Sequence, residues 1–183
     1  MTLSTILDEI RGIHRYATAD DIRKVFGDYH NVLHWLAVFL IGDEKIADAC
    51  IVDACNIAQT RGPIFHEWLV HWAARATVRC ALQTQRARIE EISHEYETGE
   101  PVTQKQSPLS AEYFRLLIQS SEVIHARLDV LSRFVLVIRG IAKDPCDEVA
   151  AQLGISPMAA ERAYSVAFDT LGLLQRDTTT MQT

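Results

Sequence analysis

The chain has 183 residues, of which 48% are hydrophobic, with only 8 glycines and 5 prolines. This composition excludes a disordered chain and predicts one medium globular domain or two small ones. The formal net charge of −6 argues against a general nucleic-acid binder held mainly by phosphate contacts, but it leaves room for a local basic patch.

The opening residues and the cysteines bear on the compartment in which the protein works. The start, MTLSTILDEIRG, has neither the basic region nor the apolar core of a signal peptide, and no apolar run approaches the length of a membrane helix. The four cysteines have no CxxC spacing; they are Cys50, Cys55, Cys80 and Cys146. We therefore expect a cytoplasmic protein with reduced thiols and no membrane partner.

Apolar residues recur at helical spacing along nearly the whole chain, and no segment alternates as a strand would, so the predicted fold class is all-α. A first helix is expected with Ser4 as its cap, and it is either an extra element packed on the core or a segment that occludes a binding face. Glycine at Gly42 and the ArgGlyPro turn at 61–63 are expected to separate later helices. The predicted helices of this half are one at about 1–19, one beginning near Thr18 or Asp20, and three with apolar stripes over 29–40, 46–57 and 65–80.

The character of the sequence changes near Glu95. The stretch YETGEPVTQKQSPLS has two prolines, a glycine and no large aliphatic cluster, which is typical of a linker. Helices are expected again over 113–123 and 128–139, and the last residues are polar. The predicted organisation is a helical N-terminal domain at 1–95, a linker at 96–111, a helical C-terminal domain at 112–176 and a tail at 177–183.

The stretch EVAAQLGISPMAAERAYSVAFDTL, residues 148–171, has the pattern of a helix-turn-helix. Gly154 permits left-handed turn geometry, Ser156 is expected to cap the second helix, and Pro157 suits its first position. Helical spacing predicts a buried face made of Ala160, Tyr164, Ala167 and Leu171. The other face is expected to point outward with Glu161, Arg162, Ser165, Val166 and Phe168.

In a DNA-reading protein this outward face would enter the major groove. Residues 147–177, however, hold two basic side chains against five acidic ones. Such a surface repels phosphate, and Val166 and Phe168 favour contact with a protein or burial against the other domain. A helical packing unit that only resembles this motif is a third interpretation.

Three stretches in order carry a resemblance to one family: YHNVLHWLAVFLIGDEKIADACIVDAC at 29–55, FHEWLVHWAARATVRCAL at 65–82, and the segment from ARLDVLSRF to AFDTL at 126–171. Over about 22–171 the chain resembles bacterial RNA polymerase sigma factors of the two-domain extracytoplasmic-function group. The resemblance implies that the protein binds core RNA polymerase and promoter DNA. An anti-sigma factor is a further candidate partner.

The resemblance assigns roles to particular residues. Asp48 and Asp53 stand in the acidic helix that grips the polymerase, although Ala49 and Val52 replace an acid and a glutamine of the family pattern. The residues placed at promoter DNA are Trp72, Arg75, Arg79, Arg86, Ser156 and Arg162. Arginine can clamp phosphate and aromatic rings can stack on unpaired bases, but the same arginines also fit a solvated helix face balanced by Glu90 and Glu91.

The second helix of the helix-turn-helix pattern, called the reading helix below, departs most from the family's sequence pattern. It carries small, apolar or acidic residues where the family is rich in Thr, Lys and Arg, namely Ala159, Glu161, Ala163, Val166 and Phe168. The alternative function is therefore a sigma-like interaction module that binds a protein through Glu161, Val166 and Phe168 and has lost specific DNA reading. No residue set favours an enzyme, a cofactor or a metal site; His30 and His34 share a helical face without an evident third ligand.

Overall fold

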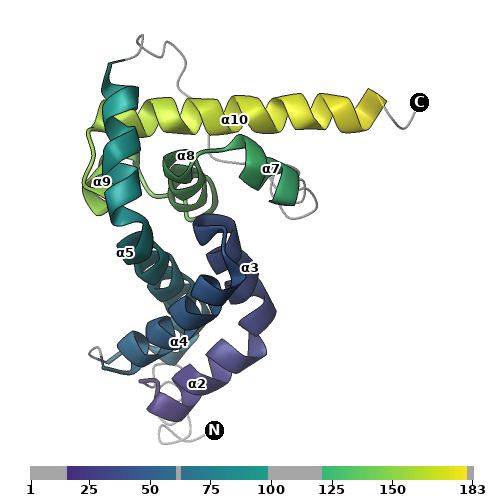
Figure 1. The fold of residues 1–183 in the computed structure, drawn as a ribbon. Helices are drawn as coiled ribbons and strands as arrows, with labels where there is room; N and C mark the ends of the chain where they lie inside the picture. Colours follow the sequence, from purple (N-terminus) through teal and green to yellow (C-terminus); the bar gives the residue numbers. More distant parts are fainter. Residues whose placement is uncertain (1–15, 61–62, 99–120, 181–183) are drawn as a thin grey trace, which may run out of the picture. The chain divides into compact units, whose positions relative to one another are not determined.

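The computed structural model describes residues 16–60, 63–98 and 121–180, and the elements of this part are helices apart from one isolated bridge between Tyr16 and Phe65 (Figure 1). The all-α prediction is confirmed over these residues. Most of the expected N-terminal helix at 1–19 and most of the expected linker lie outside them. The chain divides into two compact units, a first unit at Met1–Thr84 and a second unit at Gln85–Thr183. Each is described by itself.

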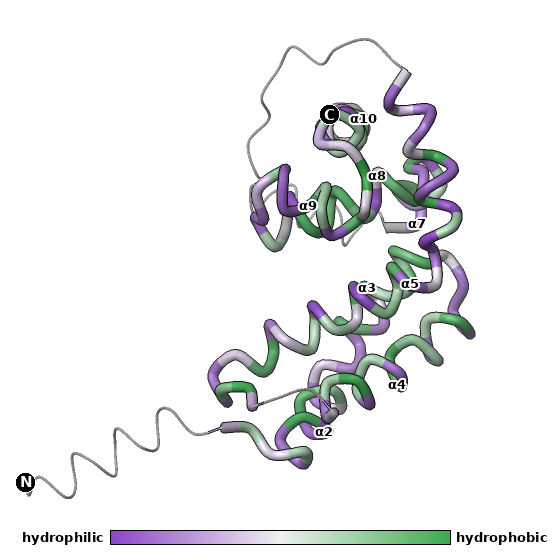
Figure 2. The backbone as a smooth tube through the Cα atoms, turned by 90° about the vertical axis from the view of Figure 1, so that its left-hand side faces the viewer, coloured by the Kyte–Doolittle hydropathy of each residue, from purple (hydrophilic) through white to green (hydrophobic). Residues whose placement is uncertain are grey.

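The first unit is built from three short helices and the beginning of a long one. Helix α3 packs on α4, and α2 packs on both. Hydrophobic residues run along α3 and α4 (green in Figure 2), and they supply buried side chains such as Leu33, Leu40 and Ile51. The elements are α2 (Ala19–Asp28), α3 (His30–Ile41), α4 (Glu44–Thr60), the 3-10 turn η1 (His66–Trp68) and α5 (Leu69–Glu97), whose later part belongs to the second unit.

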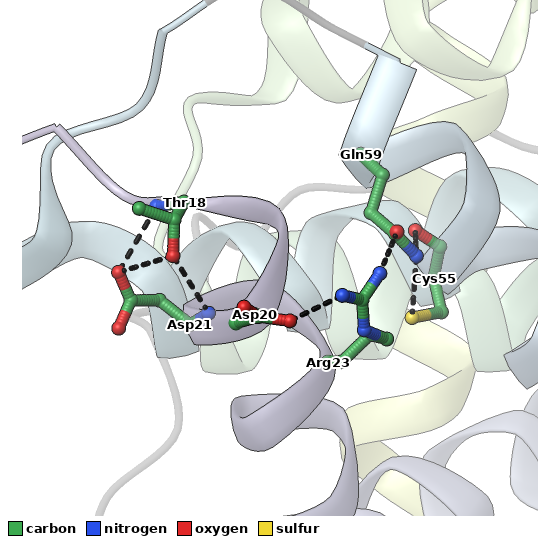
Figure 3. Close-up of polar contacts among 6 residues, drawn as sticks. All are labelled: Thr18, Asp20, Asp21, Arg23, Cys55 and Gln59. Atoms are coloured by element: carbon green, nitrogen blue, oxygen red, sulfur yellow. Dashed lines mark hydrogen bonds and ion pairs between the residues drawn. The ribbon is translucent and has the colours of Figure 1, made fainter.

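Local polar contacts fix where α2 begins and how it lies on α4. The backbone N–H of Asp21 donates to Thr18 Oγ1 at 3.2 Å, and the Thr18 N–H donates to Asp21 Oδ2 at 3.0 Å, which makes a reciprocal cap (Figure 3). Arg23, which also pairs with Asp20, donates from Nη1 to Gln59 Oε1 of α4 at 2.9 Å (Figure 3). The predicted start of this helix near Thr18 is confirmed.

A left-handed glycine separates α3 from α4, as the sequence predicted. Gly42 has φ 84°, and its N–H donates to Val38 O at 2.7 Å, which closes the last turn of α3. Asp43 then accepts a hydrogen bond at Oδ1 from the Ile46 N–H at 3.0 Å, so it satisfies a free donor at the start of α4. The Cys50 and Cys80 thiols are buried in this unit, which confirms their predicted place in the core.

The second unit packs the end of α5 with the helices of the C-terminal half. Asp129 accepts at Oδ1 from the Ser132 N–H at 2.8 Å and thereby caps α8. The last helix runs on to Thr180, so the stretch from 177 that was expected to be a tail begins as helix. The elements are α7 (Ser121–Arg127), α8 (Val130–Val135), the π-helical segment η2 (Leu136–Ile141), α9 (Cys146–Leu153) and α10 (Pro157–Thr180).

A three-residue turn joins α9 to α10. Gly154 adopts φ 72° and its N–H donates to Ala150 O at 2.8 Å, while Ser156 Oγ accepts from the Ala159 N–H at 3.2 Å. Pro157 is the first residue of α10. The predicted buried face of α10 is confirmed, with at most 1% of each side chain exposed; it comprises Ala160, Tyr164, Ala167 and Leu171.

Candidate nucleic-acid interface

The arginines of α5 are exposed, and they divide between the two units. Arg75 and Arg79 lie one turn apart on the part of α5 that belongs to the first unit. Arg86 and Arg88 lie on the part that belongs to the second unit. Within the first unit, the pair at 75 and 79 offers two guanidinium groups that can clamp phosphate bidentately.

The exposed aromatic surface of the first unit lies ahead of Trp72. Trp72 itself is half-buried, whereas Trp68 keeps 62% of its surface exposed. The Tyr16 ring stacks on Phe65 at a centroid distance of 4.9 Å, and Phe65 meets Trp68 edge-on at 6.4 Å. The Ala17 N–H donates to Ile64 O at 2.7 Å and holds these segments together.

Sequence reasoning missed this aromatic cluster. Phe65 and Trp68 share the apolar stripe of their helical segment with Leu69, so periodicity places them inside, and Leu69 alone of the three is buried. The available signal was Pro63, because proline favours the start of a helix or a turn rather than its interior; the α-helix begins only at Leu69, and Trp68 lies in a 3-10 turn. Rings held in this way present faces on which bases can stack.

The two aspartates assigned to polymerase contact are both exposed on α4. Asp48 Oδ1 lies 3.1 Å from His34 Nε2 of α3. Asp53 lies near the buried thiol pair, where its charge adds to the effect of burial and raises the pKa of Cys50 and of Cys80. A separation of five residues turns the two carboxylates to different sides of the helix, so they do not form one compact acidic site.

The outward face of α10 is less open than the sequence predicted. Val166 is exposed, but Glu161, Ser165 and Phe168 are half-buried. Glu161 Oε1 lies 4.0 Å from Arg139 Nη1, and the Phe168 ring lies 6.2 Å from that of Tyr164. Only part of this face is therefore available to a partner.

The prediction that Arg162 points outward is wrong. Only 7% of Arg162 is exposed, and its Nη1 donates a hydrogen bond to the carbonyl oxygen of Tyr96. Tyr96 lies in the last turn of α5, where carbonyl groups lack helical partners and the helix dipole favours a cation. The periodicity of α10 alone cannot reveal that the end of another helix lies beside this residue.

Two more positions of the reading helix are covered. Ala159 and Ala163 have no exposed surface, although the family resemblance places their counterparts at DNA. They share one helical face with Arg162 because the three are spaced i, i+3 and i+4. We call Ala159, Arg162 and Ala163 the covered stripe of α10.

The side chain of Tyr96 anchors the end of α5 to α8. Its hydroxyl donates to Asp129 Oδ2 at 2.6 Å and lies 2.9 Å from Ser132 Oγ. Burial and the hydrogen bond to Asp129 raise the pKa of Tyr96, so the phenol stays protonated and remains a donor. Asp129 thus serves both as the cap of α8 and as the acceptor for this tyrosine.

The remaining predicted DNA residues lie at the turn between α9 and α10. Ser156 is half-buried and caps α10, so its hydroxyl is already engaged. Arg86 is exposed, and its guanidinium lies against the turn, since a Cβ added to Gly154 would meet Nη2 at 3.5 Å. Arg86 and Ser156 are therefore neighbours of one turn, whereas Arg162 is directed toward the end of α5.

Comparison of the chain with protein-family models, curated proteins and solved structures finds no match. Among the helices that the structure describes, none is long and apolar enough to cross a bilayer. In the same part of the chain no three His, Cys, Asp or Glu side chains are grouped as metal ligands would be. The functional interpretation therefore depends on the residues and their geometry.

Proposed function

We propose that the chain is a divergent sigma-factor-like protein of transcription initiation, which binds core RNA polymerase and promoter DNA. The observation that carries the proposal is the exposed pair Arg75 and Arg79 on α5, which follows the exposed Trp68 within the same unit. A basic pair that follows exposed aromatic residues along the chain suits a strand whose bases are unpaired, because phosphates need cations and bare bases need stacking partners.

Promoter contact in this proposal comes mainly from α5 and less from α10. The turn residues Arg86 and Ser156 can add backbone contacts, but Arg162 is engaged with Tyr96, and Glu161 would repel phosphate. Such a protein would hold DNA through its backbone more than through base edges. We therefore expect weak sequence discrimination by α10.

Polymerase contact is assigned to α4. Asp48 and Asp53 are exposed carboxylates on a helix that packs against the core of its own unit. A rigid helix carrying charges suits a complementary basic surface, where electrostatic attraction contributes mainly to the association rate and to specificity.

The test of DNA contact removes the basic pair. With Arg75→Ala/Arg79→Ala, promoter binding by the polymerase complex should weaken at least ten-fold at low salt, since two phosphate contacts are lost. The slope of log affinity against log salt should fall by about 1.4 to 1.8, at about 0.7 to 0.9 for each phosphate contact. Binding titrations at several salt concentrations measure both quantities.

A matched control comes from α2 and α4. Lys24→Ala/Lys45→Ala removes the same charge from two exposed positions on other helices of the first unit. This control should leave the salt slope unchanged. Equal effects of the two double variants would show that net charge alone matters and would remove the assignment to α5.

The covered stripe of α10 favours a second candidate function, a sigma-like module that binds a protein. Arg162 is withdrawn from the surface, Glu161 carries the opposite charge to a DNA-reading residue, and Val166 is exposed with 42% of its surface. An anti-sigma factor or the polymerase itself would be the partner. Val166→Glu should then abolish partner binding while the helical circular dichroism stays unchanged.

One experiment separates the two functions. Purified chain is mixed with core RNA polymerase, the complex is captured, and initiation is measured on a panel of promoters. Binding with promoter-dependent initiation supports the sigma-factor-like function. Binding without initiation supports the interaction module, and a chain that binds no polymerase contradicts the first proposal.

A further inference from the structure

Two of the four cysteines meet in the core of the first unit. Cys50 lies on α4 and Cys80 on the part of α5 that belongs to the same unit, and at most 6% of either residue is exposed. The Cys50 Sγ donates to the carbonyl oxygen of Thr77 on α5 at 3.7 Å. A helical side chain covers the turn N-terminal to its own Cα, so Cys80 lies over this same turn. The two thiols therefore occupy one place between the two helices.

The two thiols are also in contact with each other. The S–H of Cys50 is shared between the Thr77 carbonyl oxygen and the Cys80 Sγ, and the charge of Asp53 acts on both sulfur atoms. A disulfide forms only where two sulfur atoms can approach to about 2 Å without a large backbone movement. Thiols that already share a hydrogen bond across neighbouring helices meet this requirement.

The other two cysteines are placed differently. Cys55 lies on another side of α4, and its Sγ accepts a hydrogen bond from Gln59 Nε2 at 3.4 Å. Cys146 belongs to the second unit, where its Sγ donates to the Pro157 carbonyl oxygen at 3.6 Å. The fold therefore brings together one pair out of four free thiols.

We propose that Cys50 and Cys80 form a reversible disulfide when a peroxide reaches the first unit, and that this bond ties α4 to α5. The Cys80 sulfur attacks one oxygen of hydrogen peroxide, the O–O bond breaks, and a sulfenic acid and one water result. The Cys50 sulfur then attacks the Cys80 sulfur, the S–O bond breaks, and a second water leaves. The thiols lose two electrons and two protons, which the peroxide takes up. This inference does not rest on the proposed function.

The environment of the pair sets the order of attack and the strength of oxidant required. Burial raises the pKa of Cys50, and the neighbouring Cys80 adds to this effect. Burial also raises the pKa of Cys80, but there the hydrogen bond from Cys50 opposes the rise. Cys80 therefore ionises more easily and attacks first, because the thiolate is the nucleophile. Since both thiols stay largely protonated, we expect the pair to oxidise only under sustained exposure to peroxide.

The proposal is tested on the full-length chain in buffer without denaturant. The reduced protein is exposed to hydrogen peroxide, the remaining thiols are blocked with N-ethylmaleimide, and the intact chain and its peptides are analysed by mass spectrometry. Two of the four thiols should escape blocking, the cross-linked peptide should join Cys50 to Cys80, and dithiothreitol should restore both thiols. Absence of a disulfide, or a bond between any other pair or between two molecules, would overturn the proposal.

The same oxidation in urea shows whether the fold selects the pair. In the unfolded chain short loops close most readily, so the nearest pair in sequence, Cys50 and Cys55, should dominate a mixture of products. The same mixture without urea would overturn the proposal. Cys55→Ser should leave the bond between Cys50 and Cys80 intact.

A second variant tests the order of attack. Cys50→Ala should abolish the bond and leave Cys80 as a sulfenic acid, which the reagent dimedone traps and mass spectrometry locates. Alanine keeps the site apolar, so the core of the unit is disturbed little. A chain without dimedone at Cys80 after peroxide treatment would overturn this order.

The effect of the bond on the first unit is measured by hydrogen exchange. The disulfide closes a loop of about 30 residues in the unfolded chain, which should lower the unfolding constant of the unit by about a hundred-fold. The slowest amides of α3 and α4 should exchange more slowly by a similar factor in the oxidised chain. Peroxide-treated Cys50→Ala is the control and should show no such slowing. Unchanged or faster exchange in the oxidised wild-type chain would overturn the claim that the bond ties α4 to α5.

Discussion

At the scale of single residues, the second unit is unusual in burying two arginines, Arg133 and Arg162. Burial and the nearby charge of Arg88 lower the pKa of Arg133 to about 10, and Asp129 opposes this effect. Arg133 therefore still carries its charge at neutral pH. A cation held inside the unit disfavours a second positive charge close to it.

His125 is the group that should report this effect. Burial, and next the charge of Arg133, lower the pKa of His125 below its ordinary value of 6.5. The unfolded chain then takes up a proton as the pH falls through 6.5, while the folded chain does not. The contribution of His125 to the free energy of unfolding should therefore be constant above pH 6.5. It should fall as the pH drops from 6.5 to the lowered pKa.

His125→Gln should remove that part of the pH dependence. Urea unfolding at a series of pH values, from about one and a half pH units below 6.5 to about one and a half above it, measures this pH dependence. His71→Gln, at an exposed position on α5, serves as the control and should keep the wild-type profile. A wild-type profile in His125→Gln would contradict the assignment.

Residue patterns alone predicted much of the interior but not the covered stripe. Tyr164 and Leu171 repeat at helical spacing with small residues between them, and both are buried. Arg162 was predicted to be outside because helical spacing places it on the face away from these buried residues. Its burial depends on a carbonyl of Tyr96, sixty-six residues away in sequence, and no pattern within α10 carries that information.

At the scale of elements, glycines and capping residues were the sequence features that best predicted where helices begin and end. Gly42 and Gly154 were predicted as breaks, and both adopt positive φ. The π-helical segment at Leu136–Ile141 was not predicted, because its residues continue the apolar pattern of the helix before it. Exposed Trp68 was missed for a similar reason, since a 3-10 turn and an α-helical turn have almost the same spacing.

Gly154 gives a test of the turn between α9 and α10. Gly154→Ala should lower the free energy of unfolding by about 1 to 2 kcal/mol, because an L-residue in the left-handed region is strained. The neighbouring Arg86 guanidinium, at 3.5 Å from the added Cβ, is in ordinary contact and adds little. Chemical denaturation measures the change.

Gly172→Ala is the matched control in α10. A Cβ at Gly172 meets no described atom within 4 Å, and the residue is helical. The substitution should raise the free energy of unfolding by about 0.5 to 1 kcal/mol, since alanine favours the helix. If both variants shift stability in the same direction, the left-handed turn is not the cause.

At the scale of the whole molecule, α5 contributes to both compact units. Ala73 and Cys80 lie in the core of the first unit, whereas Ile89 and Ser93 are buried in the second. The change in composition after Glu95 correctly marked the end of α5, which stops at Glu97. Composition could not show that the division between the cores falls earlier, inside a continuous helix, because helical spacing does not change there.

Ile89→Ala tests this division. It should cost about 2 to 5 kcal/mol through lost burial and a cavity, and hydrogen exchange should accelerate mainly in α8, α9 and α10. Leu33→Ala, a similar truncation in the core of the first unit, should accelerate exchange mainly in α2, α3 and α4. Uniform acceleration in either variant would show that the chain opens as a single cooperative body.

The continuity of α5 also constrains how this chain can change by recombination. A crossover between residues 84 and 85 would leave each core its own α5 side chains, but it would join the start of one helix to the end of another inside a continuous helix. A crossover after Glu97 would instead deprive the later helices of Ile89 and Ser93. We therefore expect a chimeric chain with its junction after Glu97 to be less stable than one with its junction between residues 84 and 85, because only the first separates Ile89 and Ser93 from their own core.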